Sequence, residues 1–164
     1  MKKFFTLLSL VFIITACDNT NDPSFERFFY ENADLSLPNE NSGTHVIWEQ
    51  GEKTVIVFAF QHPDEEAISD DELTELFHIE LPSDVTEFSI NTDEDAVHPD
   101  IELYYVRSCF CYFEAPYTFL RKDVSGQKIS GNQWRITFDI IAEAGDYEYQ
   151  LSDTGIYTLS SFEN

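Results

Sequence analysis

The stretch WRITFDIIA, residues 134–142, decides the fold class, because apolar side chains recur at every second position along it. Successive side chains of a β-strand point to opposite faces, so these positions share one face of a strand. The apolar positions are Trp134, Ile136, Phe138, Ile140 and Ala142. Mostly polar residues, including Arg135, Thr137 and Asp139, occupy the other face. The pattern is typical of an antiparallel strand with one face against a core and the other in water.

Further apolar or alternating runs on both sides of this stretch predict a chain made mostly of β-strands. We expect strands over residues 45–48, 54–60, 77–81, 85–90, 101–113, 117–124, 147–151 and 156–162. Turns are predicted at Gln50-Gly51, Gly145-Asp146 and Asp153-Thr154-Gly155, and a bulge is predicted near Arg107. The predicted fold class is all-β, an antiparallel β-sandwich or open barrel of about eight strands with one short helix.

The predicted helix begins at Ser69. This residue forms a capping box with Glu72, and Asp70 and Asp71 would lie in the first helical turn. The apolar residues expected on one side of the helix are Leu73, Leu76 and Phe77.

The first 16 residues have the three parts of a secretory signal peptide. Lys2 and Lys3 form a basic start, residues 4–14 are an apolar run, and Ala16 is a small residue at the cleavage site. The apolar run is shorter than the roughly 20 residues that cross a bilayer as a helix. We therefore expect this segment to be removed rather than kept as a membrane span.

Residues 14–17, Ile-Thr-Ala-Cys, resemble the lipobox of bacterial lipoproteins. The resemblance implies that Cys17 becomes the first residue of the mature protein and carries acyl chains such as palmitate. Two or more acyl chains give stable attachment where one chain binds only marginally. The expected location is the bacterial outer membrane, and both the periplasmic side and the cell surface remain open. The alternative is an ordinary signal peptide in which Cys17 is not modified.

The C-terminal turns and strands are similar to the final strands of small β-rich lipoproteins of the Bacteroidota type. The residues that carry the similarity are Ser125-Gly126, Ser130-Gly131-Asn132, Trp134–Ile140 and Gly155–Leu159. The resemblance implies the same envelope location and a β-rich fold.

The chain is expected to divide into a signal peptide (residues 1–16), a lipidated N-terminus and tether (17–42) and a single β-domain (43–164). The tether is rich in Asn, Asp, Ser and Pro, as flexible linkers are. Four aromatic residues interrupt it, and we expect them to dock this piece on the domain as a short strand or a helical turn. They are Phe25, Phe28, Phe29 and Tyr30.

The chain is strongly acidic, with 31 Asp and Glu residues against nine Lys and Arg and a net charge of −22. Signal cleavage removes two lysines and no acidic residue, which lowers the net charge by two to −24. No Lys or Arg occurs in residues 54–106. Nucleic acid is excluded as a partner, because phosphate binding requires clustered basic side chains. The acidic surface either keeps the protein soluble or attracts divalent cations or a basic partner.

Cys109 and Cys111 are the thiols left once Cys17 is lipidated. On an extended strand, positions i and i+2 lie at the edge of disulfide geometry. Three alternatives stay open: buried free thiols, a strained or redox-active disulfide, and a soft-metal site.

The acidic loop after residue 90 is a candidate calcium site. Asp93, Asp95 and Asp100 offer hard oxygen ligands, although the glycine and the distal Glu of an EF-hand are absent. A solvated loop without a metal ion is the alternative.

Five tyrosines could stack on sugars or pack in the core, and the sequence does not separate these roles. They are Tyr104, Tyr112, Tyr147, Tyr149 and Tyr157. The sequence has no Gly-x-Ser-x-Gly elbow, no glycine-rich phosphate loop and no His-Glu-x-x-His motif. The function expected is that of a non-enzymatic binding or structural module for an envelope protein or a glycan. The alternatives are a small envelope hydrolase that uses paired carboxylates and a calcium-dependent binding protein.

Overall fold

Eight β-strands form the described part of the chain, which comprises residues 23–36, 46–63, 73–92, 100–108 and 117–161 of a computed structural model. The strands are β1 (Ser24–Ser36), β2 (Ile47–Gln61), β3 (Thr74–Pro82), β4 (Glu87–Ile90), β5 (Glu102–Ser108), β6 (Thr118–Ser130), β7 (Gln133–Ala144) and β8 (Tyr147–Leu159). These described residues contain no helix. The predicted all-β class and the number of strands are therefore confirmed.

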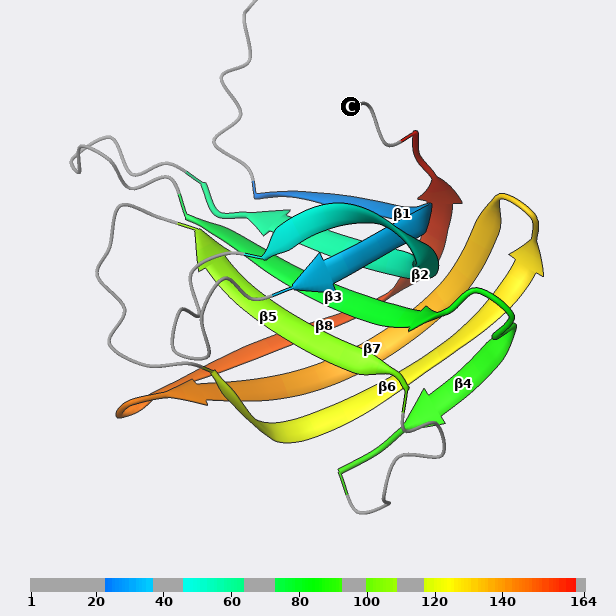
Figure 1. The fold of residues 1–164 in the computed structure, drawn as a ribbon. Coiled ribbons are helices and arrows are strands. Elements are labelled where there is room, and N and C mark those ends of the chain that lie inside the picture. Colours follow the sequence, from blue (N-terminus) through cyan, green and yellow to red (C-terminus); the bar gives the residue numbers. More distant parts are fainter. Residues whose placement is uncertain (1–22, 37–45, 64–72, 93–99, 109–116, 162–164) are drawn as a thin grey trace, which may run out of the picture.

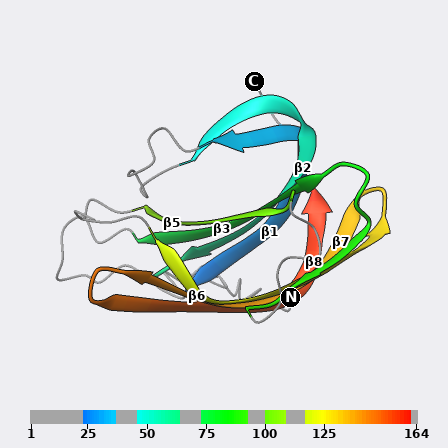
Figure 2. The same cartoon turned by 60° about the horizontal axis from the view of Figure 1, so that its bottom comes forward.

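All eight strands belong to one open sheet with the order β4-β6-β7-β8-β1-β2-β3-β5. The sheet curls so that β6 and β7 face β3 and β5 across the core (Figures 1 and 2). Every pairing is antiparallel except that of β1 with β8, which is parallel and joins only Phe28 to Thr158 and Phe29 to Leu159. One half of the sheet consists of β4, β6, β7 and β8, and the other consists of β1, β2, β3 and β5. The two halves are joined by this very short pairing of β1 with β8.

The main core lies between the two halves of the sheet, and β7 supplies its centre. The five apolar residues predicted to share one face of this strand are all buried, with at most 2% of each exposed. They pack with large apolar residues from the opposite half of the sheet: Phe29, Ile56, Phe58, Phe77, Ile79 and Tyr105. The alternating pattern of residues 134–142 therefore predicted the inner face of the central strand correctly.

The predicted boundary between tether and domain at residue 43 is wrong, because β1 lies inside the sheet. Residues 24–36, expected to dock as a short strand or helical turn, form a strand of 13 residues between β2 and β8. Phe29 on this strand is fully buried in the main core. The aromatic residues of the predicted tether thus indicated a central strand of the domain.

The last residues of β1 and the first residues of β2 bend together over the outer face of the sheet (Figure 2). The bend contains Asn32, whose φ of 59° lies in the left-handed region that Asn tolerates. It also contains a bulge, in which Ala33 faces both Gln50 and Lys53. The predicted turn at Gln50-Gly51 is therefore wrong, and these residues continue β2. We call residues 32–36 and 46–53 the flap.

The flap covers a second, smaller core on the outer face of the sheet, formed by Ala33, Leu35, Val55 and Val57. Because of this cover, β3 is buried on both faces, whereas its alternating sequence predicted one buried face. His78 and Glu80, on the face expected to be exposed, have at most 1% of their surface exposed. The Leu35 N–H donates to Glu80 Oε2 at 2.5 Å, and the Lys53 ammonium pairs with Oε1. Glu80 thus fastens both strands of the flap to β3.

Three further predictions of local structure are wrong over the described residues. The predicted helix is a strand from Thr74 onward, while residues 69–72 lie outside the described part. The predicted turn at residues 153–155 lies within the continuous strand β8. The pairing of β3 with β5 has no register shift at Arg107, so no bulge occurs there.

Replacing Glu80 with Ala should lower the free energy of unfolding by about 3 kcal/mol, because it leaves a lysine and a backbone N–H without their buried acceptor. The measurement is urea unfolding. Glu87→Ala on β4, where the carboxylate is exposed, is the matched control and should change stability by less than about 0.5 kcal/mol. Equal losses in the two variants would contradict the role of Glu80.

Candidate functional site

A cleft of about 420 Å³ opens between β8 and the half of the sheet that begins with β1. Its lining consists of three phenylalanines, one leucine and several polar residues: Phe25, Arg27, Phe58, Phe60, His62, Glu75, Gln150, Leu151, Ser152 and Asp153. We call it the β1–β8 cleft. Its volume lies within the range of roughly 300–1,000 Å³ that is usual for small-ligand sites.

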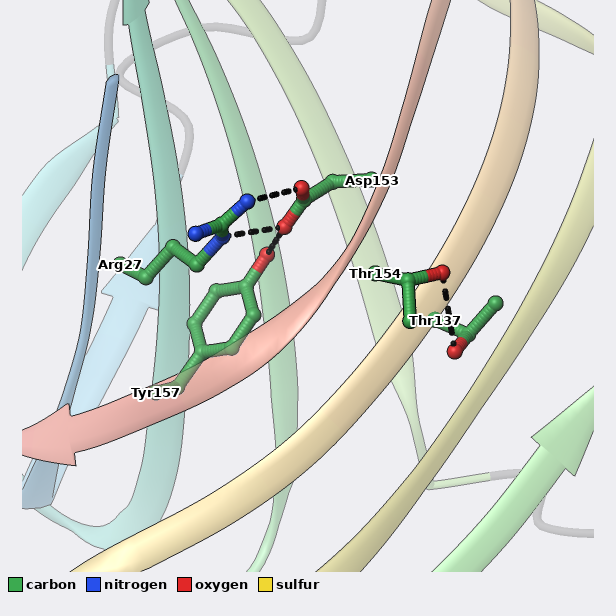
Figure 3. A network of polar contacts seen from close by, with 5 residues as sticks. All are labelled: Arg27, Thr137, Asp153, Thr154 and Tyr157. Atoms are coloured by element: carbon green, nitrogen blue, oxygen red, sulfur yellow. Dashed lines mark hydrogen bonds and ion pairs between the residues drawn. The ribbon is translucent and has the colours of Figure 1, made fainter.

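The cleft exists because β1 and β8 pair at only two positions. Residues 24–27 of β1 have no partner on β8, so the gap between the strands is bridged by side chains instead. The Arg27 guanidinium donates from Nε to Asp153 Oδ2 at 2.7 Å and from Nη2 to Oδ1 at 2.5 Å (Figure 3). The Tyr157 hydroxyl donates to Asp153 Oδ2 at 2.9 Å. Arg27 and Asp153 line the cleft, and the buried Tyr157 holds Asp153 in place.

Gly155 makes room for this bridge. A Cβ at position 155 would lie 2.4 Å from Arg27 Nε, which is far closer than such atoms approach in proteins. The guanidinium therefore passes directly over the backbone of β8 to reach Asp153. Thr154 points away from this network and toward the Thr137 hydroxyl (Figure 3).

Arg27 is held in its charged form and Tyr157 in its neutral form. The hydrogen bonds to Asp153 raise the pKa of Arg27 above its usual value. Burial, followed by the Asp153 charge, raises the pKa of the Tyr157 hydroxyl, so it stays a donor at any physiological pH. A bidentate guanidinium–carboxylate pair with a phenol on the same carboxylate is a strong and geometrically specific arrangement.

One wall of the cleft is aromatic. Phe25 is 54% exposed, although its ring stacks on Phe58 with an interplanar angle of 17° and a centroid distance of 6.4 Å. The Arg27 guanidinium lies over the same ring, 4.3 Å from its centroid. The Phe25 ring is therefore fixed in place by two neighbours while much of its surface faces solvent.

Glu75 lies on the opposite side of the cleft. It accepts a hydrogen bond from the Tyr105 hydroxyl at 2.6 Å, and Arg107 Nε lies 3.3 Å from its Oε1. His62 Nε2 lies 3.2 Å from the second carboxylate oxygen. The Arg107 guanidinium also stacks on Tyr149, 4.1 Å from the ring centroid. Each carboxylate in the cleft, Glu75 and Asp153, is thus matched by one guanidinium.

No local pattern in the sequence indicated this site. Arg27 and Asp153 are 126 positions apart, and the register that brings them together depends on the curl of the sheet. Gly155 was interpreted as part of a turn, because glycine marks turns more often than it marks places where another side chain crosses a strand. The one usable signal was the run of aromatic residues beginning at Phe25.

Most of the predicted site residues lie outside the described part of the chain: Cys17, Asp93, Asp95, Cys109, Cys111 and Tyr112. Asp100 is exposed and lines a second, acidic pocket of about 540 Å³ with Asp34, Glu52, Lys53, Pro82, Ser83, Asp84 and Glu102. Within the described ranges no three His, Cys, Asp or Glu side chains are placed to hold a metal ion. The calcium site and the cysteine alternatives therefore stay predictions.

The described tyrosines divide between core and surface. Tyr157 is buried, Tyr149 packs against the main core, and Tyr104 packs against the second core. Tyr147 is 69% exposed, at the start of β8 and outside the lining of the β1–β8 cleft. The exposed ring that the structure places in a cleft is instead Phe25.

His78 is the buried titratable group of the second core. Its ring contacts Trp48 of the flap at a centroid distance of 5.7 Å, and its Nδ1 has no hydrogen-bond partner among the described residues. Burial lowers the pKa of His78 to about 4, although a hydrogen bond with the Tyr104 backbone opposes this. His78 is therefore neutral at pH 7 and packs under the flap as an uncharged side chain.

Comparisons of this chain with protein-family models, curated proteins and solved structures found no match. Among the described residues, no helix has the length and apolar character to span a membrane.

A double-mutant cycle measures the bridge across the cleft. Arg27→Ala, Asp153→Ala and the double variant should show a coupling energy of about 2 kcal/mol in urea unfolding, because a mostly buried bidentate pair is lost in each single variant. A coupling near zero would mean that the pair does not hold β1 to β8. Arg121 and Asp139, a more exposed pair on β6 and β7, should couple by less than about 1 kcal/mol.

The stability of the protein should fall as the pH drops from 6.5 toward about 4. In this window the unfolded His78 binds a proton and the folded His78 does not, so unfolding is favoured by up to about 1.4 kcal/mol per pH unit. His78→Gln should remove this part of the pH dependence. Identical pH profiles of the two proteins in chemical unfolding would contradict the buried neutral state.

Proposed function

We propose that this protein is a lipid-anchored, non-enzymatic binding module of the bacterial envelope, which holds an envelope protein or a glycan in its β1–β8 cleft. Cys17 would supply the anchor in the outer membrane through its acyl chains. The observation that carries the binding role is the cleft itself, in which a fixed, solvent-facing phenyl ring lies beside paired polar side chains.

The state of the two carboxylates in the cleft supports binding over hydrolysis. A glycosidase needs one carboxyl group as a proton donor and a second as a base or nucleophile. Asp153 accepts hydrogen bonds from both a guanidinium and a phenol, and Glu75 is matched by Arg107 and the Tyr105 hydroxyl. Carboxylates that are held by these partners shape the cleft, and they are not placed to act as a proton donor, base or nucleophile.

The distribution of charge also supports a binding role. The chain as a whole carries a net charge of −22, yet the two carboxylates of the cleft are each neutralised by a guanidinium. The acidic exterior would keep the anchored domain away from anionic lipid surfaces, because like charges repel. The cleft would then face the aqueous phase, where a partner can reach it.

The experiment that tests this proposal exposes the purified lipoprotein in detergent to polysaccharide and protein fractions of the envelope and measures both retention and the release of new reducing ends. Retention of one fraction without hydrolysis is the expected result, and Glu75→Gln should leave the background signal for reducing ends unchanged. Reducing ends that appear with the wild-type protein and vanish in Glu75→Gln would establish a hydrolase instead.

The anchor is tested separately by fractionation of cells. Cys17→Ser should move the protein from the membrane fraction to the soluble fraction and abolish its labelling by radioactive palmitate. Cys109→Ser, which keeps Cys17, is the matched control and should leave both properties unchanged. Persistence of Cys17→Ser in the washed membrane fraction would mean that acylation of Cys17 is not the anchor.

A further inference from the structure

We infer that the β1–β8 cleft binds an uncharged sugar unit of a glycan, with the apolar face of the sugar ring on Phe25. This inference rests on the proposed binding function and names the ligand class of the same site. It is carried by three properties of the described residues: the position of the Phe25 ring, the charge balance of the cleft and the hydrogen-bonding capacity that its side chains retain.

Phe25 has the properties of a stacking platform. Slightly more than half of its surface is exposed, while stacking on Phe58 and contact with the Arg27 guanidinium hold the ring in one orientation. An exposed ring that is already fixed loses little conformational entropy when a ligand covers it. A sugar ring presents a flat face of C–H groups, which can pack against the part of the Phe25 ring that these two contacts leave exposed.

The charge balance of the cleft selects an uncharged ligand. A cationic ligand would find Asp153 and Glu75 already paired with guanidinium groups. An anionic ligand would find the Arg27 guanidinium committed to Asp153, and the surrounding net charge of −22 would repel it. Uncharged polar groups meet neither penalty, which favours hydroxyl groups over carboxylates, phosphates and amines.

The bridge leaves both donors and acceptors available at the cleft. Arg27 uses its Nε and Nη2 on Asp153, and a guanidinium has five N–H groups in all. Asp153 accepts three hydrogen bonds in the structure, while an ionised carboxylate offers about four lone-pair sites. Donors and acceptors side by side suit neighbouring hydroxyl groups, since each hydroxyl both donates and accepts.

The cleft also differs from a peptide-binding site. Peptides that add to a sheet are held mainly by backbone hydrogen bonds along an open strand edge. In this cleft the polar groups are side chains, and the Arg27–Asp153 bridge crosses the gap beside β1 that an added strand would need. A peptide ligand is therefore an alternative outcome of the experiment rather than the expectation.

The test is binding of the full-length lipoprotein in detergent to defined ligands, measured by isothermal titration calorimetry and saturation-transfer NMR. The probes are neutral oligosaccharides of glucose, galactose, mannose and N-acetylglucosamine, with an oligogalacturonate as the anionic comparator. We expect at least one neutral oligosaccharide to bind and the oligogalacturonate not to bind. Saturation transfer should be strongest at ring C–H protons.

Phe25→Ala should weaken binding of that oligosaccharide about tenfold, because the stacking face is lost. Tyr147→Ala, which removes another highly exposed aromatic ring outside the cleft, is the matched control and should bind as the wild type does. Phe25→Trp should retain binding, which separates loss of the platform from loss of folding. Arg27→Lys keeps the charge but loses the planar fork, and should also weaken binding.

Two results would overturn the sugar inference and leave the proposed binding function intact. One is retention of an envelope protein fraction that Phe25→Ala reduces, with no binding of any neutral oligosaccharide. The other is binding of oligogalacturonate as tightly as the neutral probes. Hydrolysis of an oligosaccharide that is lost in Glu75→Gln would instead overturn the proposed non-enzymatic function. Binding that is equal in Phe25→Ala and Tyr147→Ala would show that the sugar lies elsewhere.

Discussion

The ion pair between Arg27 and Asp153 compensates for a weak point in the sheet. Backbone pairing joins the two halves of the sheet at only two positions of β1 and β8, supported by a hydrogen bond from the Ser160 N–H to the Phe29 carbonyl at 2.9 Å. Beyond this point the strands separate, and side chains must connect them. The Arg27 guanidinium can do so because Gly155 has no side chain in its path. The same separation of strands produces the cleft, so the bridge and the candidate site have one structural cause.

Three of the few cations of this protein lie against buried carboxylates. Nine Lys and Arg residues face 31 Asp and Glu residues, and three of the nine form pairs with the carboxylates of Asp153, Glu80 and Glu75. Each pair joins different strands. A buried charge without a partner is costly, whereas an exposed carboxylate is stabilised by water. This placement leaves most acidic groups of the chain without a cationic partner, whereas Asp153 and Glu75 in the cleft each have one.

The flap buries side chains on the other face of the sheet. Its apolar side chains could not stay in water, and they cover Val55 and Val57 of β2. In doing so they bury His78 and Glu80, whose positions on an alternating strand would otherwise face solvent. The neutral His78 and the paired Glu80 are two different solutions to burial, because an imidazole can lose its charge near neutral pH and a carboxylate needs a partner. The sheet is thereby covered on both faces along β3, the strand that contributes Glu75 to the cleft.

The sequence by itself determined the all-β class, the central strand at residues 134–142 and the Gly145-Asp146 turn, because local alternation and turn chemistry are sufficient for these features. It also indicated that the aromatic residues from Phe25 to Tyr30 dock on the domain, and of these Phe29 is fully buried whereas Phe25 is 54% exposed. Only the tertiary structure decided that β1 enters the sheet, that Gln50-Gly51 and Gly155 continue strands, and that residues from Thr74 are extended rather than helical. The cleft belongs to this second group. Its lining residues come mainly from β1, β2, β3 and β8. The curl of the sheet that brings them together is set by packing between distant segments, which no local sequence pattern records.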